Sequence, residues 1–172
     1  VVAQQENYKK SGFKLAYSNI RYEGKGTKEK SAYSNIVPLS QVPFEKLLAY
    51  DNQIFPVSRP AFLNLWIQQP KNLALGVVKN NNLLGYSMVR KCRTGFKVGP
   101  LFTDTEEIAD TLFQTMRSFI GENSSIFLDV PEVNKNAIKL AERYHMKPVF
   151  GTARMYTKEP PNTPLHKVFG VT

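Results

Sequence analysis

Apolar residues follow two kinds of pattern along this chain. Stretches in which apolar residues recur every three or four positions are typical of helices, and short apolar runs bounded by turn residues are typical of strands. From Ile36 onward the pattern predicts strands over 36–39, 73–78, 83–92, 96–102, 126–130, 149–156 and 166–171, and helices over 42–50, 58–69, 103–120 and 134–144. Because antiparallel strands come first and strand–helix alternation follows, this order favours the α/β class, of the α+β type, with helices on both faces of one mixed, mostly antiparallel sheet.

Two side-chain placements follow from the pattern. In the helix over 58–69, Phe62, Leu65 and Trp66 fall on one face, and we expect Trp66 to lie in the core. His166 belongs to the last predicted pair of strands, where we expect it to face solvent.

The first 35 residues have a different organisation. Residues 1–11 are polar and compatible with a helix that ends at Gly12, and residues 13–22 alternate partly as a strand does. Residues 23–34 are charged and contain glycine, which predicts a linker. An unpaired strand edge is a liability, so the strand over 13–22 should pair either with the main sheet or with a second copy of the chain, giving a homo-oligomer.

Composition and charge narrow the class of protein. Of the 172 residues, 42% are apolar and 22% charged, which is ordinary for a globular protein, and no apolar run approaches the roughly 20 residues of a membrane helix. The net charge is +9, but Lys and Arg are scattered, so nucleic acid is a poor candidate for a partner. A lone cysteine, Cys92, interpreted as a small strand residue rather than a nucleophile, fits a reducing, cytoplasmic setting. We assign no metal and no membrane partner.

Four stretches of the main domain carry a resemblance to known proteins: Gly99–Asp104, Leu128–Asn134, Ala153–Tyr156 and Val168–Thr172. Together they resemble the GNAT acyltransferase superfamily, and in particular the C-terminal domain of the tandem-GNAT, YitH-like acetyltransferases. The segment Asn7–Phe13 resembles the end of the fourth helix of an ordinary GNAT domain. The resemblance therefore implies the tail of a preceding GNAT domain over 1–23, a linker over 24–35 and a GNAT domain over 36–172, as if the chain were cut from a longer protein.

The resemblance implies a site for acetyl-CoA. In this superfamily the fourth and fifth strands splay apart, the acyl-pantetheine arm lies between them, and the pyrophosphate binds N–H groups at the start of the next helix. The usual glycines are missing from the turn over 102–107, which instead has three carboxylates that compete with a pyrophosphate for the helix dipole. The coenzyme-binding residues implied by the resemblance are Leu101, Phe102, Thr103, Asp104, Thr105 and Asn134.

Acyl transfer from a thioester to an amine needs a proton acceptor, an oxyanion donor and an acid for the thiolate. The backbone N–H of Leu101 or Phe102 is the implied oxyanion donor. Asp129, at the end of the fifth strand, is the candidate base; alternatively it pairs with Arg90 or Arg154, or caps the loop before Asn134.

The tyrosine that usually acts as general acid in the family is absent from this domain. Its position aligns with Ala141, which leaves Tyr144, three residues further along the helix, as a possible substitute. The corresponding Tyr of the preceding domain is Tyr8. Arg154 and Tyr156, on the sixth strand, are candidates for binding the acceptor.

Two functions of different kinds remain open. The first is an acetyl-CoA-dependent N-acetyltransferase, or the C-terminal part of one, acting on an unknown amine. The second is a non-catalytic GNAT-like domain that binds the coenzyme, shapes the acceptor groove or contacts a partner. They differ in whether the turn at 101–107 presents free N–H groups to a cleft.

Overall fold

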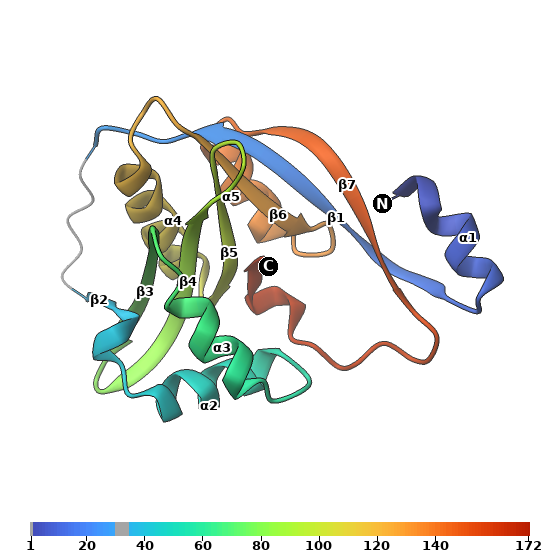
Figure 1. The fold of residues 1–172 in the computed structure, drawn as a ribbon, viewed down its shortest axis with the longest axis horizontal. Coiled ribbons are helices and arrows are strands. Elements are labelled where there is room, and N and C mark those ends of the chain that lie inside the picture. The colour runs from blue at the N-terminus through green and yellow to red at the C-terminus, as the bar shows by residue number, and fades with distance from the viewer. Residues whose placement is uncertain (1, 30–34) are drawn as a thin grey trace.

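One sheet of eight strands organises the computed structural model, which describes residues 2–29 and 35–172 (Figure 1). Neighbouring strands are antiparallel except for one parallel pair, β5 and β6. This confirms the predicted mixed α/β fold. The strand order is β2 (Ile36–Pro38), β3 (Asn72–Lys79), β4 (Asn82–Lys91), β5 (Phe96–Thr103), β6 (Ser125–Pro131), β1 (Lys14–Lys25) and β7 (Lys147–Tyr156), with β8 (Val168–Gly170) paired to β5 off this path.

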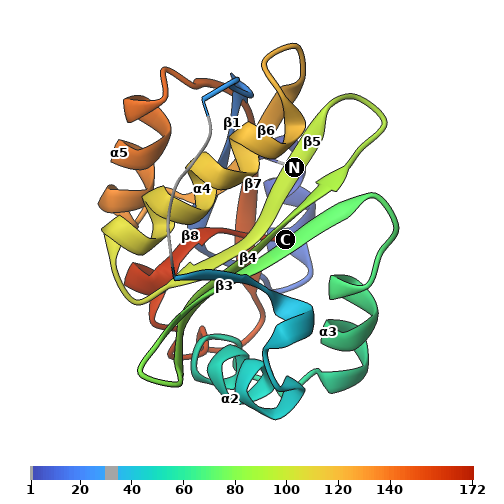
Figure 2. The ribbon, with the colours of Figure 1, turned by 90° about the vertical axis from the view of Figure 1, so that its left-hand side faces the viewer.

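Helices cover both faces of the sheet and create two cores. Figure 2 shows α4 and α5 on one side of β3, β4 and β5, with α2 and α3 on the other. Adjacent strand residues point to opposite faces, so Leu101 joins the core under α4 and α5 while Phe102 joins the core under α2 and α3. None of the helices within the described residues is both long and apolar enough to cross a membrane. The helices are α1 (Gln5–Lys10), α2 (Phe44–Ile54), α3 (Pro60–Ile67), α4 (Glu106–Ile120) and α5 (Lys135–Arg143).

The buried face of α3 differs from the prediction. Leu63 is the fully buried residue of this helix, whereas Phe62 is exposed and Leu65 has 72% of its surface open. Trp66 is partly buried, and its Nε1–H donates to the carbonyl of Gly99 at 3.3 Å. Because almost every residue of this short helix is apolar, the sequence pattern could not select the face that packs on the sheet.

The N-terminal strand lies inside the main sheet. α1 ends at Lys10, and Gly12, with φ of 83°, turns the chain into β1, which runs between β6 and β7 and pairs antiparallel with both. Of the two pairings predicted for this strand, the structure has the one with the main sheet, and β1 is longer than predicted. Association with a second copy stays a prediction. Of the predicted linker, residues 30–34 lie outside the described residues.

The last two strands are not neighbours, and the predicted pairing between them is wrong. β7 pairs with β1, while the chain after it crosses the molecule, forms a short 3₁₀ turn over Leu165–Lys167 and returns as β8 beside β5 (Figure 1). His166 is exposed as predicted, but it belongs to this turn. The C-terminal segment therefore ends in the centre of the sheet.

A buried ion pair ties α2 to the loop before α3. Arg59 donates from Nε and from Nη2 to the carboxylate of Asp51, at 2.9 and 2.7 Å, and the Tyr86 hydroxyl donates to the same carboxylate. Asp51 is fully buried and Arg59 nearly so. Burial, together with the neighbouring charge of Asp51, raises the pKa of Tyr86 well above its ordinary value, so the hydroxyl stays protonated.

Candidate functional site

The space between β5 and β6 is where the sequence resemblance places acetyl-CoA. These strands pair in parallel only over Phe96–Val98 and Ile126–Leu128, and then diverge. β8 lies in the gap that opens between them. Leu101 of β5 pairs with Gly170, and Phe102 pairs with Val168. On the other side, the N–H of Val171 donates to the carbonyl of Asp129 at 2.9 Å.

The packing of β8 leaves no room in this gap. Phe169 is 1% exposed, and its ring belongs to the core under α4 and α5. A methyl group added at Gly170 would lie 2.6 Å from Leu128 Cδ1 and 3.2 Å from Leu101 Cβ, both closer than side-chain atoms normally approach. A larger residue here would require Leu128 and Leu101 to shift, so the glycine lets β8 pack closely against both.

Asn134 fixes the segment that leads into β8. Its Oδ1 accepts from the N–H groups of Asn136 and Ala137, both at 3.2 Å, so it is the N-cap of α5. Its Nδ2 lies 3.1 Å from the carbonyl of Leu165 and 2.9 Å from that of Val168, and donates to them. The residue implied as a pantetheine contact thus binds the chain's own C-terminal segment.

Side chains of the turn predicted to hold the pyrophosphate are bonded to other groups of the protein. Thr105 is the N-cap of α4, and the Thr103 hydroxyl donates to the carbonyl of Thr105 at 2.9 Å. The carboxylate of Asp104 accepts from the Tyr50 hydroxyl at 3.0 Å and pairs with Lys167 at 2.9 Å. Lys167 comes from the same C-terminal segment, so the negative turn is compensated from within the chain.

These contacts test whether acetyl-CoA fits between β5 and β6. The backbone of β5 that would bind the pantetheine arm is paired with β8, and Leu101, Leu128 and Gly170 are in close contact across the gap. The residues present in this gap do not fit the coenzyme.

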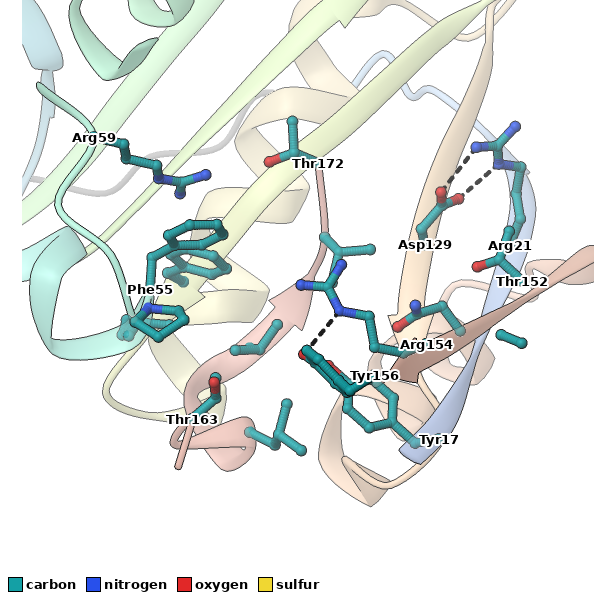
Figure 3. Close-up of a pocket in the computed structure, with 18 of the residues that line it drawn as sticks. Tyr17, Arg21, Phe55, Arg59, Asp129, Thr152, Arg154, Tyr156, Thr163 and Thr172 are labelled. Atoms are coloured by element: carbon teal, nitrogen blue, oxygen red, sulfur yellow. Dashed lines mark hydrogen bonds and ion pairs between the residues drawn. The ribbon is translucent and has the colours of Figure 1, made fainter. Parts of the chain in front are cut away.

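A cavity of about 440 Å³ opens beside the end of β8 (Figure 3). Volumes of this size are typical of small-molecule sites. Its wall combines β1 and β7 on one side with the loop between α2 and α3 on the other. The lining residues are Tyr17, Asn19, Arg21, Ile54, Phe55, Pro56, Arg59, Lys97, Phe102, Asp129, Thr152, Ala153, Arg154, Tyr156, Thr163, Leu165, Val168, Val171 and Thr172.

Asp129 lies in this wall but is paired with two cations. Arg21 sits directly opposite it across the β1–β6 ladder and donates from Nε at 2.6 Å and from Nη2 at 2.8 Å. Lys97 donates to Oδ2 at 2.8 Å. Burial raises the pKa of Asp129. The hydrogen bonds from Arg21 and Lys97 together lower it by more than burial raises it, so the pKa of Asp129 lies below its ordinary value. A carboxylate held ionised in this way is a weak base, and its partners are not the Arg90 or Arg154 expected from the sequence.

Arg154 and Tyr156 lie together in the cavity, with Tyr17 beside them (Figure 3). Arg154 is exposed, and its Nε donates to the Tyr156 hydroxyl at 3.0 Å. Across the β1–β7 ladder Arg154 faces Tyr17. Burial raises the pKa of Tyr17, although the charge of Arg154 acts in the opposite direction, so both residues present hydrogen-bond donors to the cavity.

Asn19 is the buried polar residue of this wall. It is 7% exposed, and its Oδ1 has no hydrogen-bond partner within the described residues. Asn19 pairs with Thr152 in the ladder, two residues along from the pair of Tyr17 and Arg154 and on the same face. Buried polar atoms are nearly always satisfied, so an unpaired one at the wall of a cavity calls for a partner that enters the cavity.

The candidate acids lie away from the cavity wall. Tyr144 is the C-cap of α5, donates to Asp110 of α4 at 2.8 Å and packs against Phe113. Ala141 is fully buried in the core. Tyr8 is half exposed on α1. The structure thus brings Asp129, Phe102, Arg154 and Tyr156 to one cavity and leaves the tyrosines Tyr8 and Tyr144 outside it.

Sequence reasoning missed the contribution of β1. Tyr17, Asn19 and Arg21 all line the cavity because residues two apart on a strand share a face. Their alternation was visible, but the identity of the neighbouring strands was not. No group of three or more His, Cys, Asp or Glu side chains suited to a metal ion occurs within the described part of the chain.

Fold and site thus define a mixed α/β domain with a cavity of the size that small molecules occupy. A family model for the acetyltransferase (GNAT) domain matches residues 47–170, and the chain belongs to this family. GNAT acetyltransferases use acetyl-CoA as their co-substrate.

Individual relatives are more distant. The chain is 23% identical over 165 residues to the holothin acyltransferase of a Pseudoalteromonas species, covering 96% of this chain and 56% of that protein. A protein from Pyrococcus horikoshii assigned as an acetyltransferase has a similar structure, with a TM-score of 0.81 and 21% identity over 99% of this chain and 56% of that one. A Drosophila protein has a TM-score of 0.69 and 11% identity, with coverage of 90% and 57%. The chain therefore spans little more than half the length of these relatives.

Proposed function

We propose that the chain is the acceptor-binding domain of a longer, acetyl-CoA-dependent N-acyltransferase, which transfers an acyl group from a thioester to an amine. Residues 1–23 would be the end of a preceding GNAT domain, and the structure has most of that segment as α1 and β1. The coenzyme is then held elsewhere in the longer protein. Such a division of roles explains why a member of the family has a gap between β5 and β6 that does not accept the coenzyme.

The observation that carries the proposal is the position of β8. A domain that binds acetyl-CoA needs β5 free beyond its parallel pairing with β6, but here Leu101 and Phe102 are paired with β8. The same segment leaves a cavity open at its end, lined by Val168, Val171 and Thr172. The open cavity therefore supports binding of the acceptor, and the closed gap argues against binding of the coenzyme.

The residues of the cavity then bind and orient the acceptor. Arg154, Tyr156 and Tyr17 offer hydrogen-bond donors, and the wall from the α2–α3 loop provides the ring of Phe55. Asp129 holds Arg21 and Lys97 in place and does not accept the proton from the amine. Proton transfer is assigned to groups outside this chain.

Filling the cavity tests this function in the longer protein. With Thr152→Trp, which places a large side chain beside Asn19, we expect kcat/KM for the amine to fall about 100-fold or more, because misplacing a bound reactant has effects of this size. The KM for acetyl-CoA should change by no more than about twofold, since the coenzyme binds elsewhere. Steady-state kinetics with both substrates varied provide the measurement.

The matched control is Thr157→Trp, at an exposed position just beyond β7. This variant should keep the parent's kcat/KM for the amine. An unchanged kcat/KM for Thr152→Trp, or an equal loss in the control, would contradict the proposal.

A further inference from the structure

The charges around the cavity do not balance. Four cationic side chains line it, and carboxylates pair with three of them: Arg21 and Lys97 with Asp129, and Arg59 with the buried Asp51. Arg154 has no carboxylate partner within the described residues. The four cations and two carboxylates leave an excess of two positive charges. One belongs to the group of Arg21, Lys97 and Asp129, and the other is at Arg154, where no carboxylate side chain shares it.

The uncharged polar groups suit a ligand with both an anionic and a donor group. Tyr17 stays protonated and faces Arg154 across the ladder, so it offers a donor next to the guanidinium. Asn19 lies two residues further along the same wall, and its Oδ1, an acceptor, has no donor within the described residues, so it suits the N–H of an amine. Asp129, the one carboxylate side chain among the lining residues, is already used by two cations. Beside Arg154 the wall thus offers donors and no free carboxylate side chain.

We propose that the acceptor bound in this cavity carries a carboxylate in addition to its amine, and that Arg154 binds that carboxylate. A planar guanidinium matches a carboxylate geometrically, and such charge-assisted hydrogen bonds are among the strongest in proteins. Tyr17 donates to the same carboxylate, Asn19 Oδ1 accepts from the amine, and Phe55 and Tyr156 contact the apolar part of the ligand. The inference rests on the proposed function in that it takes the ligand to be the acyl acceptor.

Matched pairs of small molecules test the carboxylate. The ¹⁵N-labelled chain is titrated, without coenzyme, with phenylalanine against phenethylamine and with 4-aminobenzoate against aniline, and dissociation constants are taken from NMR shifts. In at least one pair the carboxylate-bearing member should bind about 10-fold or more tightly, which is the size of effect that a charge-assisted hydrogen bond produces.

Variants then locate the effect. Arg154→Gln should abolish the preference for the carboxylate, while Arg154→Lys, which keeps the charge without the fork, should retain part of it. Arg93→Gln, at an exposed position outside the cavity, is the matched control and should keep the full preference. Asn19→Leu keeps the branched shape of the side chain and should weaken binding of both members of a pair. Because Arg154 is exposed, its variants should unfold at the same denaturant midpoint as the parent.

Three results would overturn the inference. The first is that neither pair prefers the carboxylate, and the second is that Arg154→Gln leaves the preference intact. The third is that CoA, added as a competitor, displaces the carboxylate ligands from the parent but not from Arg154→Gln, because the anion recognised would then be a coenzyme phosphate. A carboxylate preference in a longer protein without acyl transfer would contradict only the proposed function, and acyl transfer without the preference would contradict only this inference.

Discussion

Replacing Arg59 with Met should lower the free energy of unfolding by about 3–5 kcal/mol, the range found when one partner of a buried ion pair is removed. The carboxylate of Asp51 is fully buried, and without Arg59 it keeps only the Tyr86 hydroxyl as a hydrogen-bond donor of those observed. The guanidinium also lies 3.8 Å from the centre of the Phe55 ring, so the cavity wall loses a contact. Urea denaturation, followed by circular dichroism, measures the change.

Two further variants define the cause. Arg93→Met, at an exposed position, should change stability by less than about 0.5 kcal/mol. The double variant Asp51→Leu/Arg59→Met removes both charges and should recover most of the loss, because hydrophobic replacement of a whole buried pair is often close to neutral. A loss below about 1 kcal/mol for Arg59→Met alone would show that Asp51 finds other compensation, and the buried ion pair would not account for the anchoring of α3.

The second large effect is expected at β8. Phe169→Ala should destabilise the chain by about 3–5 kcal/mol, as is usual for truncating a buried Phe to Ala. Phe169 is 1% exposed and packs in the same core as Leu101, Leu128 and the helices α4 and α5. Because β8 belongs to the sheet, removing the Phe169 ring would leave a cavity in the core between β5 and β6.

The matched control is Phe119→Ala on α4, where the ring is half exposed and the loss should stay below about 1 kcal/mol. Chemical denaturation of both variants gives the comparison. If Phe169→Ala were as mild as the control and also created affinity for acetyl-CoA, β8 would be a displaceable segment rather than a permanent strand.

Elements with a strong local pattern were predictable from the sequence. The hairpin of β3 and β4 turns at Asn80 and Asn81, whose φ angles of 50° and 64° suit asparagine. The helix α4 has a capping residue at Thr105 and one apolar face. In both cases the deciding residues are close in sequence, so the prediction needed no knowledge of the tertiary arrangement.

Strand neighbours were not predictable, and the site depends on them. Asp129 is neutralised by Arg21, which is 108 residues away in sequence, because β1 lies beside β6. A strand pattern shows which side chains share a face, but it does not identify the strand that lies next to it. For the same reason, the sequence placed Arg154 and Tyr156 on the acceptor side, while it gave no sign of Asn19.

The position of β8 had the same origin. The last apolar run was expected to pair with the strand before it, as consecutive strands commonly do. Three contacts between residues far apart in sequence hold this run beside β5 instead. Asn134 donates to the carbonyl of Val168, Lys167 pairs with Asp104, and the N–H of Val171 donates to the carbonyl of Asp129. These contacts convert the implied coenzyme gap into protein core.

We expect this chain to bind an acceptor and not to bind acetyl-CoA between β5 and β6. The most direct measurement is a titration of the ¹⁵N-labelled chain with acetyl-CoA, followed at the amides of Leu101, Phe102 and Gly170. We predict no saturable shift of these three signals at millimolar coenzyme, because their backbone is paired within the sheet. Saturable shifts at micromolar coenzyme, centred on the same amides, would contradict the account.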